Sequence, residues 1–471
     1  MNNIRRACLV LVPLLLTLAG CRQQAALPPP VQPAYVDSGD SEPITTLSTT
    51  AGVTMLPDTT GRFGLTQIFD WDGTSHPPLT ASQIEGEAPH EDSVWGAYYP
   101  QYWNATHSGM LVSRYMLPVE DDYSVSQHNL TWWKTNHPSW ILYACDSKGN
   151  PTTQLAWSTD GFADVPLDFA NTSVVQYQMN LLIPYMKAHG YNTLAADNTD
   201  LTNYLKGGNP ELGQTYISGY YGCGYYVGST FHRVFGPGND PAFISAMVNW
   251  VSAASSSLHA AGYKLVINHP LYNPPTNTNE AALLSHADGM VYERGFTDYG
   301  KYKTEAASLV SPAITWASYA QSHHVAFFIV DYLCTGWNGT QPFNNNAACP
   351  TDPALIPAPQ ADWALATYAL VNQGGAGVYI SPQTGQRLSY RTEYATHYGS
   401  PCSAYTTLAT NVYERKFVSG LVVVNAGTTP YTLHLSTSHT FHDIEKRAVP
   451  NPLTVAPADA YVLLTQYGCS A

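Results

Sequence analysis

Residues 165–201, VPLDFANTSVVQYQMNLLIPYMKAHGYNTLAADNTDL, decide the fold, because a helix, a stop and a buried strand follow one another in this stretch. Residues 171–173 supply side chains suited to an N-cap, and Gly190 suits the position that ends a helix. Between them, apolar residues recur on one helical face, at Val175, Met179, Leu182 and Met186. The run 193–196 is short and has no polar face, which favours a buried parallel strand ending at Asp197.

The same alternation of apolar strand and helical segment recurs along the chain. Eight strands are predicted, at 66–69, 110–116, 140–143, 193–196, 264–267, 289–292, 325–330 and 376–380. Further helices are predicted at 241–261, 312–321 and 361–372. This count predicts an α/β fold of the (β/α)8 TIM-barrel type. The alternative is a doubly wound open sheet, but residues 70–73, Asp-Trp-Asp-Gly, do not form the Gly-rich phosphate loop which that fold requires.

The 471 residues divide into four predicted segments. Residues 1–20 form a lipoprotein signal peptide, and residues 21–60, rich in Pro, Ser and Thr, form a flexible tether. Residues 61–400 form the barrel. Residues 401–471 contain short strands separated by Gly, Pro, Thr and Asn, which predicts a small antiparallel β-domain.

The first residues indicate export and a lipid anchor. Arg5 and Arg6 precede an apolar run at 7–16, and Leu-Ala-Gly-Cys at 18–21 resembles the bacterial lipobox, in which Cys21 carries the lipid. A plain signal peptide cut near Ala19 is the alternative. The lipobox resemblance, with Arg after the cysteine, implies an anchor in the outer membrane on its periplasmic or cell-surface side.

Composition narrows the range of partners. The net charge of −14 argues against a nucleic-acid backbone and leaves room for neutral or cationic ligands. Charged residues make up only 11% of the chain, while 33 Tyr and 11 Trp are present, a composition that suits sugar rings stacking on aromatic faces. For any single Tyr, ordinary core or interface packing is the more common explanation. We expect a monomer.

Cys8 belongs to the signal peptide and Cys21 carries the lipid, so six cysteines remain, and an even number in an exported chain favours disulfides. Cys334 and Cys349 are expected to close one loop, Cys402 and Cys469 can join the ends of the C-terminal domain, and the other pairing stays open. No CxxC or HExxH spacing occurs, so no metal and no cofactor is predicted.

Carboxylates follow several predicted strands, at Asp70, Asp72, Asp146, Asp197, Glu293 and Asp331. The carboxyl ends of barrel strands meet at one face, where such enzymes carry their catalytic residues. Converging carboxylates without a metal motif favour glycoside hydrolysis, which needs one acid and one carboxylate that attacks or activates water.

Asp197 and Glu293 form the favoured catalytic pair, because the fourth and sixth strands end there and lie across the mouth from each other. A turn or capping role is the alternative for Asp197, and an ion pair with Arg294 or a lysine is the alternative for Glu293. Asp331 is the reserve catalytic residue for an inverting mechanism. Predicted sugar contacts are Asp70, Asp72, His269, Tyr292, Arg294 and Asp331, with structural packing an equal alternative for His269 and Tyr292.

The segment between Asp197 and Lys264 is long and contains Tyr216, Tyr220, Tyr221, Tyr225 and Tyr226. Such a segment at the mouth of a barrel forms subsite walls or a lid, or else it packs over the barrel without contacting substrate. Both interpretations stay open.

Short motifs over residues 65–466 resemble TIM-barrel glycoside hydrolases related to endo-α-1,4-polygalactosaminidases. These motifs are Leu-Asp-Phe-Ala-Asn at 167–171, Ala-Asp-Asn at 196–198, Ala-Asp-Gly at 287–289 before Glu293, and Tyr-Glu-Arg-Lys-Phe at 413–417. The resemblance implies Asp197 as nucleophile and Glu293 as acid/base, with retention of configuration. The resemblance indicates the class of reaction more specifically than it indicates which sugar is cleaved.

We therefore expect a membrane-tethered retaining glycoside hydrolase that cleaves a polysaccharide, with an amino-sugar exopolysaccharide favoured weakly by the acidic charge. The alternative is a non-catalytic carbohydrate-binding lipoprotein with a degenerate barrel. Carboxyl separation distinguishes mechanisms, because retention needs about 5–5.5 Å and inversion about 6.5–9.5 Å. A metal-dependent deacetylase is disfavoured, since no Asp/His cluster has ligand spacing.

Overall fold

The structure is a computed structural model that describes residues 58–69, 80–104, 110–157, 164–297, 302–332, 358–381, 390–465 and 468–469. Asp70, Asp72, Cys21, Cys334 and Cys349 lie outside these residues. Among the described helices, none is both long enough and apolar enough to cross a bilayer.

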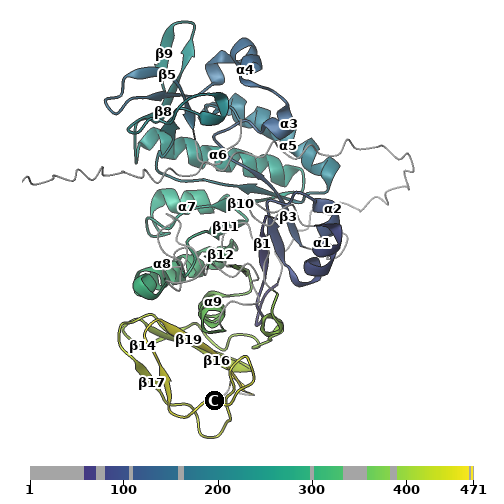
Figure 1. The fold of residues 1–471 in the computed structure, drawn as a ribbon, viewed down its shortest axis with the longest axis vertical. Helices are drawn as coiled ribbons and strands as arrows, with labels where there is room; N and C mark the ends of the chain where they lie inside the picture. The colour runs from purple at the N-terminus through teal and green to yellow at the C-terminus, as the bar shows by residue number, and fades with distance from the viewer. Residues whose placement is uncertain are drawn as a thin grey trace, which may run out of the picture. The chain divides into compact units, whose positions relative to one another are not determined.

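Eight parallel strands form one sheet that closes on itself, which confirms the predicted TIM barrel (Figure 1). A parallel bridge between Leu65 and Val378 joins the first strand to the last. In barrel order the strands are β1 (Thr66–Ile68), β2 (Ser93–Trp95), β3 (Leu111–Met116), β6 (Thr193–Ala196), β10 (Lys264–Asn268), β11 (Gly289–Tyr292), β12 (Ala326–Tyr332) and β13 (Ala376–Ser381).

Two of the predicted barrel strands need correction. The second barrel strand is β2, three residues that the sequence reading did not identify, so β3 is the third strand. The run 140–143 leads into β4 (Tyr143–Cys145), which belongs to a separate antiparallel sheet. Asp146 therefore lies in an exposed turn of that sheet, where its carboxylate accepts bonds from Lys148 and Asn150, and not at the barrel mouth. The fourth and sixth positions, β6 and β11, are unaffected.

Helices lie between the barrel strands along the chain, as expected. They are α1 (Ala81–Glu87), α2 (Pro100–Asn104), α5 (Thr172–His189), α6 (Pro241–Ala260), α7 (Thr278–Leu284), α8 (Tyr302–Ser322) and α9 (Ala358–Val371). Helix α8 begins ten residues before the predicted start, and Pro312 lies inside it. The prediction placed Pro312 at the start of this helix, where proline is tolerated best, but neighbouring packing can hold helical turns on both sides of a proline.

The opening stretch folds as its residues predict. The Asn171 side chain accepts a hydrogen bond from the Ser173 amide, and Gly190 ends α5 with φ of 83°. The apolar face of α5 is buried, and β6 is buried throughout between β3 and β10. The position of Asp197 at the end of β6 is therefore fixed by the barrel, and its amide donates to the Met116 carbonyl at 2.9 Å.

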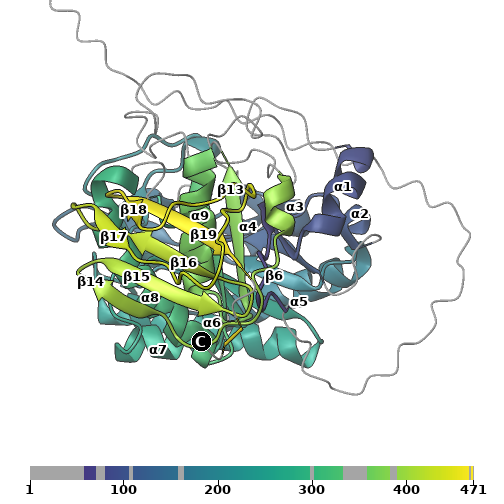
Figure 2. The same cartoon turned by 90° about the horizontal axis from the view of Figure 1, so that it is seen from below.

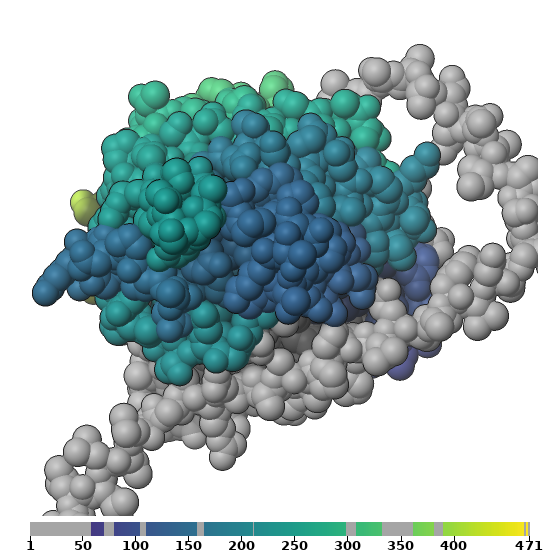
Figure 3. Space-filling view, turned by 90° about the horizontal axis from the view of Figure 1, so that it is seen from above, coloured from purple at the N-terminus to yellow at the C-terminus, as the bar shows by residue number. Residues whose placement is uncertain are grey.

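Two inserts, after β3 and after β6, build a five-stranded antiparallel sheet in the order β7-β5-β4-β8-β9. Figure 3 shows them side by side, residues near 140 in blue beside residues near 220 in teal. The disulfide between Cys145 and Cys223 joins the first insert to the second. The elements are α3 (Tyr123–Ser126), α4 (Leu130–Asn136), β5 (Pro151–Trp157), β7 (Lys206–Gly207), β8 (Tyr221–Val227) and β9 (Thr230–Arg233).

The C-terminal residues form the predicted antiparallel β-domain, which packs on α9 (Figure 2). Its disulfide joins Cys402 to Cys469, as the flanking positions suggest. One sheet has the order β14-β15-β16-β19, and β17 pairs with β18. The bounds are β14 (Thr406–Ala409), β15 (Val412–Phe417), β16 (Gly420–Asn425), β17 (Tyr431–Leu433), β18 (Leu453–Val455) and β19 (Asp459–Leu464).

Arg415 connects the two domains by capping a helix. Its buried guanidinium donates to three carbonyls at the end of α9, those of Ala369, Leu370 and Asn372, at 3.3, 3.1 and 2.6 Å. The last carbonyls of a helix have no partner within it and carry its negative dipole end, so a cation is stabilising there. Burial lowers the pKa of Arg415, which marks the desolvation that these bonds offset.

Replacing Arg415 with Met is expected to destabilise the protein by roughly 3 kcal/mol, because buried carbonyls lose a charged donor. Thermal unfolding monitored by circular dichroism measures this change. Arg447→Met is the control, since its side chain is 64% exposed and pairs only with nearby carboxylates. Equal melting temperatures for Arg415→Met and the control would contradict the capping role.

Candidate active site

Asp197 follows β6 and is held by three donors. The Tyr115 hydroxyl donates to Oδ2 at 2.6 Å, and the Asn268 amide donates to Oδ1 at 2.7 Å. The backbone amide of Asn198 donates to Oδ1 at 2.8 Å. Asn198 has φ of 53°, a left-handed conformation that Asn adopts more readily than most residues. The turn after β6 therefore brings its own amide onto the carboxylate.

Glu293 follows β11, and its loop is held from below by Asp331. The Phe296 amide donates to the buried Asp331 carboxyl at 2.7 Å. Between them, Gly295 has φ of 53°, and a Cβ there would come within 2.3 Å of the same carboxyl. Glycine at this position lets the loop that carries Glu293 pass close over Asp331.

The Asn268 side chain connects the two carboxyls. Its Nδ2 atom lies 2.7 Å from Oδ1 of Asp197 and 3.2 Å from Oε2 of Glu293. The separation of these two oxygens cannot exceed the sum of the two bond lengths, about 5.9 Å. Strand order explains the placement, because β10, which ends at Asn268, pairs with β6 on one side and β11 on the other.

The two carboxyls differ in their electrostatic surroundings. Burial raises the pKa of Asp197, and its bonds from Tyr115, Asn268 and Asn198 oppose that rise. Burial and, to a smaller extent, the charge of Asp197 together raise the pKa of Glu293 to about 7, and the bond from Asn268 opposes this rise. Both side chains keep part of their surface exposed while their carboxyl ends lie deep among protein atoms. The donors therefore favour ionisation of Asp197, and the raised pKa of Glu293 favours its protonated form below about pH 7.

Aromatic rings from the first two strands pack against Tyr115, the residue of the third strand that donates to Asp197. Tyr115 meets Phe69 edge-on with centroids 5.3 Å apart, and Trp95 with centroids 6.4 Å apart. Phe69 has φ of 53°, which is rare for a bulky residue and is found where the surroundings enforce it. A Cβ on Gly96 would come within 2.5 Å of the Phe69 ring, so glycine leaves room for that ring.

A buried pair stabilises the loop beside Asp197. His269 Nε2 lies 2.5 Å from Glu280 of α7, and its Nδ1 lies 2.9 Å from the Thr199 carbonyl. Thr199 in turn donates its amide and hydroxyl to the Asn268 carbonyl, at 3.1 and 2.7 Å. The loop after β6 is thereby tied to the end of β10.

The predicted sugar contacts fall into three groups. His269 and Asp331 are 1% and 0% exposed, which corrects their assignment, because a side chain without accessible surface cannot touch a sugar. Tyr292 is also buried, at 4%, and Arg294 is half-buried beside Glu293. Asp70 and Asp72 lie outside the described residues. Burial raises the pKa of Asp331 to about 7, and its bond from the Phe296 amide opposes this.

Sequence reasoning did not assign roles to Tyr115 or Asn268. Both signals were available, because Asn268 ends a predicted strand and Tyr115 lies near the end of another. The prediction was based on carboxylates at the ends of strands, and neither of these two side chains is charged. Among the described residues, no group of three or more His, Cys, Asp or Glu side chains has an arrangement suited to a metal ion.

Comparison with protein-family models and with curated proteins gives no match. Among solved structures, the chain is similar to the noncanonic maltogenic α-amylase AmyB from Thermotoga neapolitana, with TM-score 0.45 and 11% identity over 86% of this chain and 99% of that one. It is similar to a variant of the GH36 α-galactosidase AgaA from Geobacillus stearothermophilus in complex with raffinose (TM-score 0.40, 8% identity, 86% and 56% covered). It is also similar to Ega3 of Aspergillus fumigatus in complex with galactosamine (TM-score 0.36, 10% identity, 71% and 97% covered). At this distance the likenesses assign no activity to the chain.

Replacing Asn268 with Ala is expected to raise the pKa of both Asp197 and Glu293, because the amide stabilises both anions. Carboxyl ¹³C chemical shifts followed through a pH titration measure the change. Asn279→Ala on the exposed side of α7 is the control and should leave both values unchanged. Unaltered titration of both groups in Asn268→Ala would contradict the bridge.

Proposed function

We propose that the protein is a retaining glycoside hydrolase that cleaves a polysaccharide, with Asp197 as nucleophile and Glu293 as general acid/base. The observation that carries the proposal is a pair of half-buried carboxyls joined by one amide, of which only Asp197 is well supplied with donors. A catalytic acid and a catalytic carboxylate need this difference in proton affinity.

The separation of the pair supports retention. The limit of about 5.9 Å between the two bridged oxygens agrees with the roughly 5–5.5 Å of retaining enzymes and is shorter than the roughly 6.5–9.5 Å that leaves room for an inverting water. In this mechanism Asp197 attacks the anomeric carbon while Glu293 gives its proton to the departing glycosidic oxygen. Glu293, now ionised, then takes a proton from the water that releases the sugar from Asp197.

Donors around Asp197 have a defined part in this reaction. Tyr115 and Asn268 hold the carboxylate oxygens in fixed directions, so that the nucleophile does not reorganise during attack. When Asp197 becomes esterified, the repulsion that raises the pKa of Glu293 disappears. The second carboxyl then ionises more readily, which suits its change from acid to base.

Two features of the sequence support the proposed substrate and location. The resemblance to polygalactosaminidase-related barrels and the net charge of −14 favour a polymer that carries amino sugars. The segment with Arg5, Arg6 and the Leu-Ala-Gly-Cys at 18–21 favours a lipid anchor at Cys21, on the periplasmic or cell-surface side of the outer membrane. This arrangement would bring the enzyme close to an exopolysaccharide.

Asp197→Asn and Glu293→Gln are each expected to lower the rate of polysaccharide hydrolysis by on the order of 10³-fold or more, because each removes a group that acts only in the transition state. Release of reducing ends from a panel of bacterial polysaccharides measures this. Asp288→Asn is the matched control, since Asp288 precedes the same strand that Glu293 follows, at the opposite end of the barrel. Equal activity in all four proteins would exclude the mechanism, and binding without cleavage by the wild type would favour a non-catalytic binding protein.

The value of kcat/KM, measured over a range of pH, is expected to decline as pH rises through about 7, because Glu293 must be protonated to act as acid.

The free energy of unfolding should depend on the protonation of the same carboxyl. The pKa of Glu293 is raised from 4.5 to about 7 on folding, so the folded state binds more protons between these values, and stability falls as pH rises through this window. The difference in unfolding free energy between wild type and Glu293→Gln, measured at several pH values, isolates this contribution. A difference that stays constant with pH would contradict it.

Tyr272 is expected to provide a stacking surface for a sugar beside the pair. It lies on the loop after β10 and is 65% exposed. Partial burial raises the pKa of Tyr272, the charge of Asp200 adds to the rise, and the charge of Arg294 opposes it. Tyr272→Ala should raise KM roughly three- to tenfold with little change in kcat, while Tyr272→Phe keeps the ring and stays near wild type. Equal KM values for the Ala and Phe variants would exclude stacking.

A further inference from the structure

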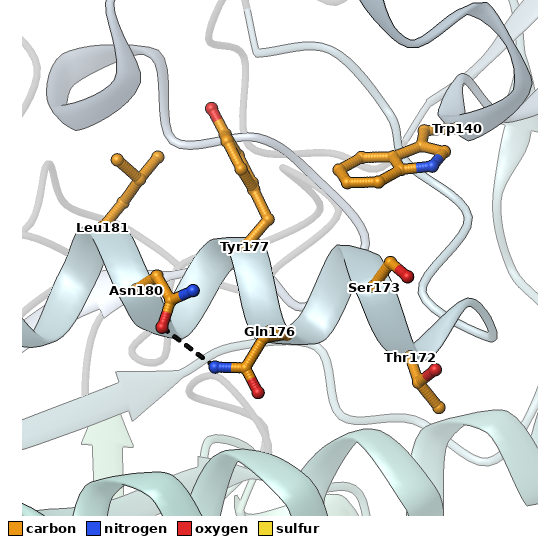
Figure 4. Close-up of a pocket in the computed structure, with 7 residues that line it drawn as sticks. All are labelled: Trp140, Thr172, Ser173, Gln176, Tyr177, Asn180 and Leu181. Carbon is orange, nitrogen blue, oxygen red and sulfur yellow. Dashed lines mark hydrogen bonds between the residues drawn. The ribbon is translucent and has the colours of Figure 1, made fainter.

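A groove lies outside the barrel, between the first insert and α5. It has a volume of about 510 Å³ and is lined by Trp140, Tyr177, Gln176, Asn180, Ser173 and Thr172, together with Leu181 (Figure 4). Trp140 ends a 3₁₀ turn, η2 (Pro138–Trp140), and the other residues come from the outer side of α5. None of them bonds to Asp197 or Glu293 in the described contacts.

Two aromatic rings form a corner of this groove. Trp140 and Tyr177 have centroids 5.9 Å apart and planes inclined by 71°. His137 stacks on Trp140 at 4.2 Å, so one face of the indole is already covered. Both rings remain partly exposed. In Figure 4 Tyr177 rises from the side of α5 that faces Trp140, which lies on a separate segment, while Gln176 and Asn180 point to the lower side of the helix.

The corner is rigid before any ligand arrives. The Tyr177 hydroxyl bonds to His128 Nδ1 at 2.7 Å, and its ring meets the buried Trp133 edge-on at 5.3 Å. Trp133 is fixed in turn by a bond from its indole nitrogen to Asp121 at 2.9 Å. A preformed aromatic surface loses little side-chain conformational entropy when a ligand binds, so more of the contact energy remains as affinity.

Polar side chains of the groove are all uncharged. Gln176 donates to Asn180 at 2.9 Å, and both are exposed, so each amide keeps further donors or acceptors for a ligand. Ser173 and Thr172 add two exposed hydroxyls near the indole. In a chain with net charge −14, an uncharged patch selects against strongly ionic ligands and suits one that offers many hydroxyls and an apolar ring face.

We propose that this groove is a second carbohydrate-binding site, in which an uncharged pyranose stacks in the corner of Trp140 and Tyr177 and bonds to the amides of Gln176 and Asn180. The groove would hold a distant part of the same polysaccharide that the carboxyl pair cleaves. The proposal rests on the proposed function only for the class of ligand, because binding here requires no turnover. Holding a polymer at two places raises the effective concentration of the chain at the cleavage site.

The test is affinity electrophoresis of the full chain in gels that contain α-1,4-linked poly-N-acetylgalactosamine or, in parallel, its partly deacetylated form. All variants carry Glu293→Gln, so that the polymer stays intact. Trp140→Ala and the pair Gln176→Ala/Asn180→Ala are expected to bind the N-acetylated polymer at least roughly fivefold more weakly. Because the lining is uncharged, that binding should change little with added salt.

His189→Ala is the matched control, since this exposed ring lies on the same helix, stacks on Tyr185 and is far along α5 from the groove. Weaker binding in both groove variants but not in the control supports the site. Wild-type retardation in the Gln176/Asn180 pair overturns it, even where Trp140→Ala binds weakly, because loss in that variant alone indicates a disturbed insert.

Failure of this site and failure of the proposed function are distinguishable. In the catalytically intact background, groove variants should cleave short oligosaccharides within roughly twofold of wild type and cleave the long polymer about fivefold more slowly. Unchanged cleavage of both substrates contradicts the groove and leaves the carboxyl pair standing. Loss of cleavage of both substrates together also contradicts it, because a remote binding site does not act on short chains.

Discussion

One amide group, on Asn268, makes the rest of the site possible. Two carboxyls within about 5.9 Å of each other repel, and partial burial makes each charge more costly. A neutral donor that reaches both oxygens relieves the repulsion without adding a charge that would lower both pKa values strongly. The donors to Asp197 from Tyr115 and the Asn198 amide then break the symmetry. Proton affinity therefore differs between the carboxyls because of hydrogen-bond number, while both are partly buried.

The surrounding fold maintains this geometry through contacts that never reach the mouth. The His269–Glu280 pair ties the loop after β6 to the end of β10, and Asp331 supports the loop that carries Glu293. Such buried polar groups cost stability unless they are paired, so their bonds here fix positions more than they stabilise. Residues assigned to sugar contact from their place in the sequence, His269 and Asp331, belong to this layer. Solvent accessibility distinguishes a residue that contacts sugar from one that supports the loops, and the sequence does not show solvent accessibility.

Prediction from the sequence succeeded where the pattern was long and failed where it was short. The helix at 172–189 followed by β6 carries caps, a helical apolar face and a buried strand, and all three signals agree. Strand β2 has only three residues, Ser93–Trp95, which is too short to show a repeating pattern of apolar residues. The apolar run at 140–143 reads the same in a parallel or an antiparallel sheet, so its place depended on pairing with β8. Asn268 and Tyr115 were missed because a search for charged groups ignores the neutral donors that tune them.

The two inserts extend from the strands beside the carboxyl pair to the outer surface. They follow β3 and β6, the strands that carry Tyr115 and Asp197, and the Cys145–Cys223 disulfide and shared sheet make them one unit. Three tyrosines of the second insert pack within this sheet: Tyr221 is buried, Tyr225 stacks on His232, and Tyr226 donates to the Thr152 carbonyl. The first insert also provides Trp140, so the outer groove exists only because the insert packs against α5. One disulfide-linked appendage therefore contacts both the loop that carries Asp197 and the outer groove, so a polymer that reached both would run along its surface.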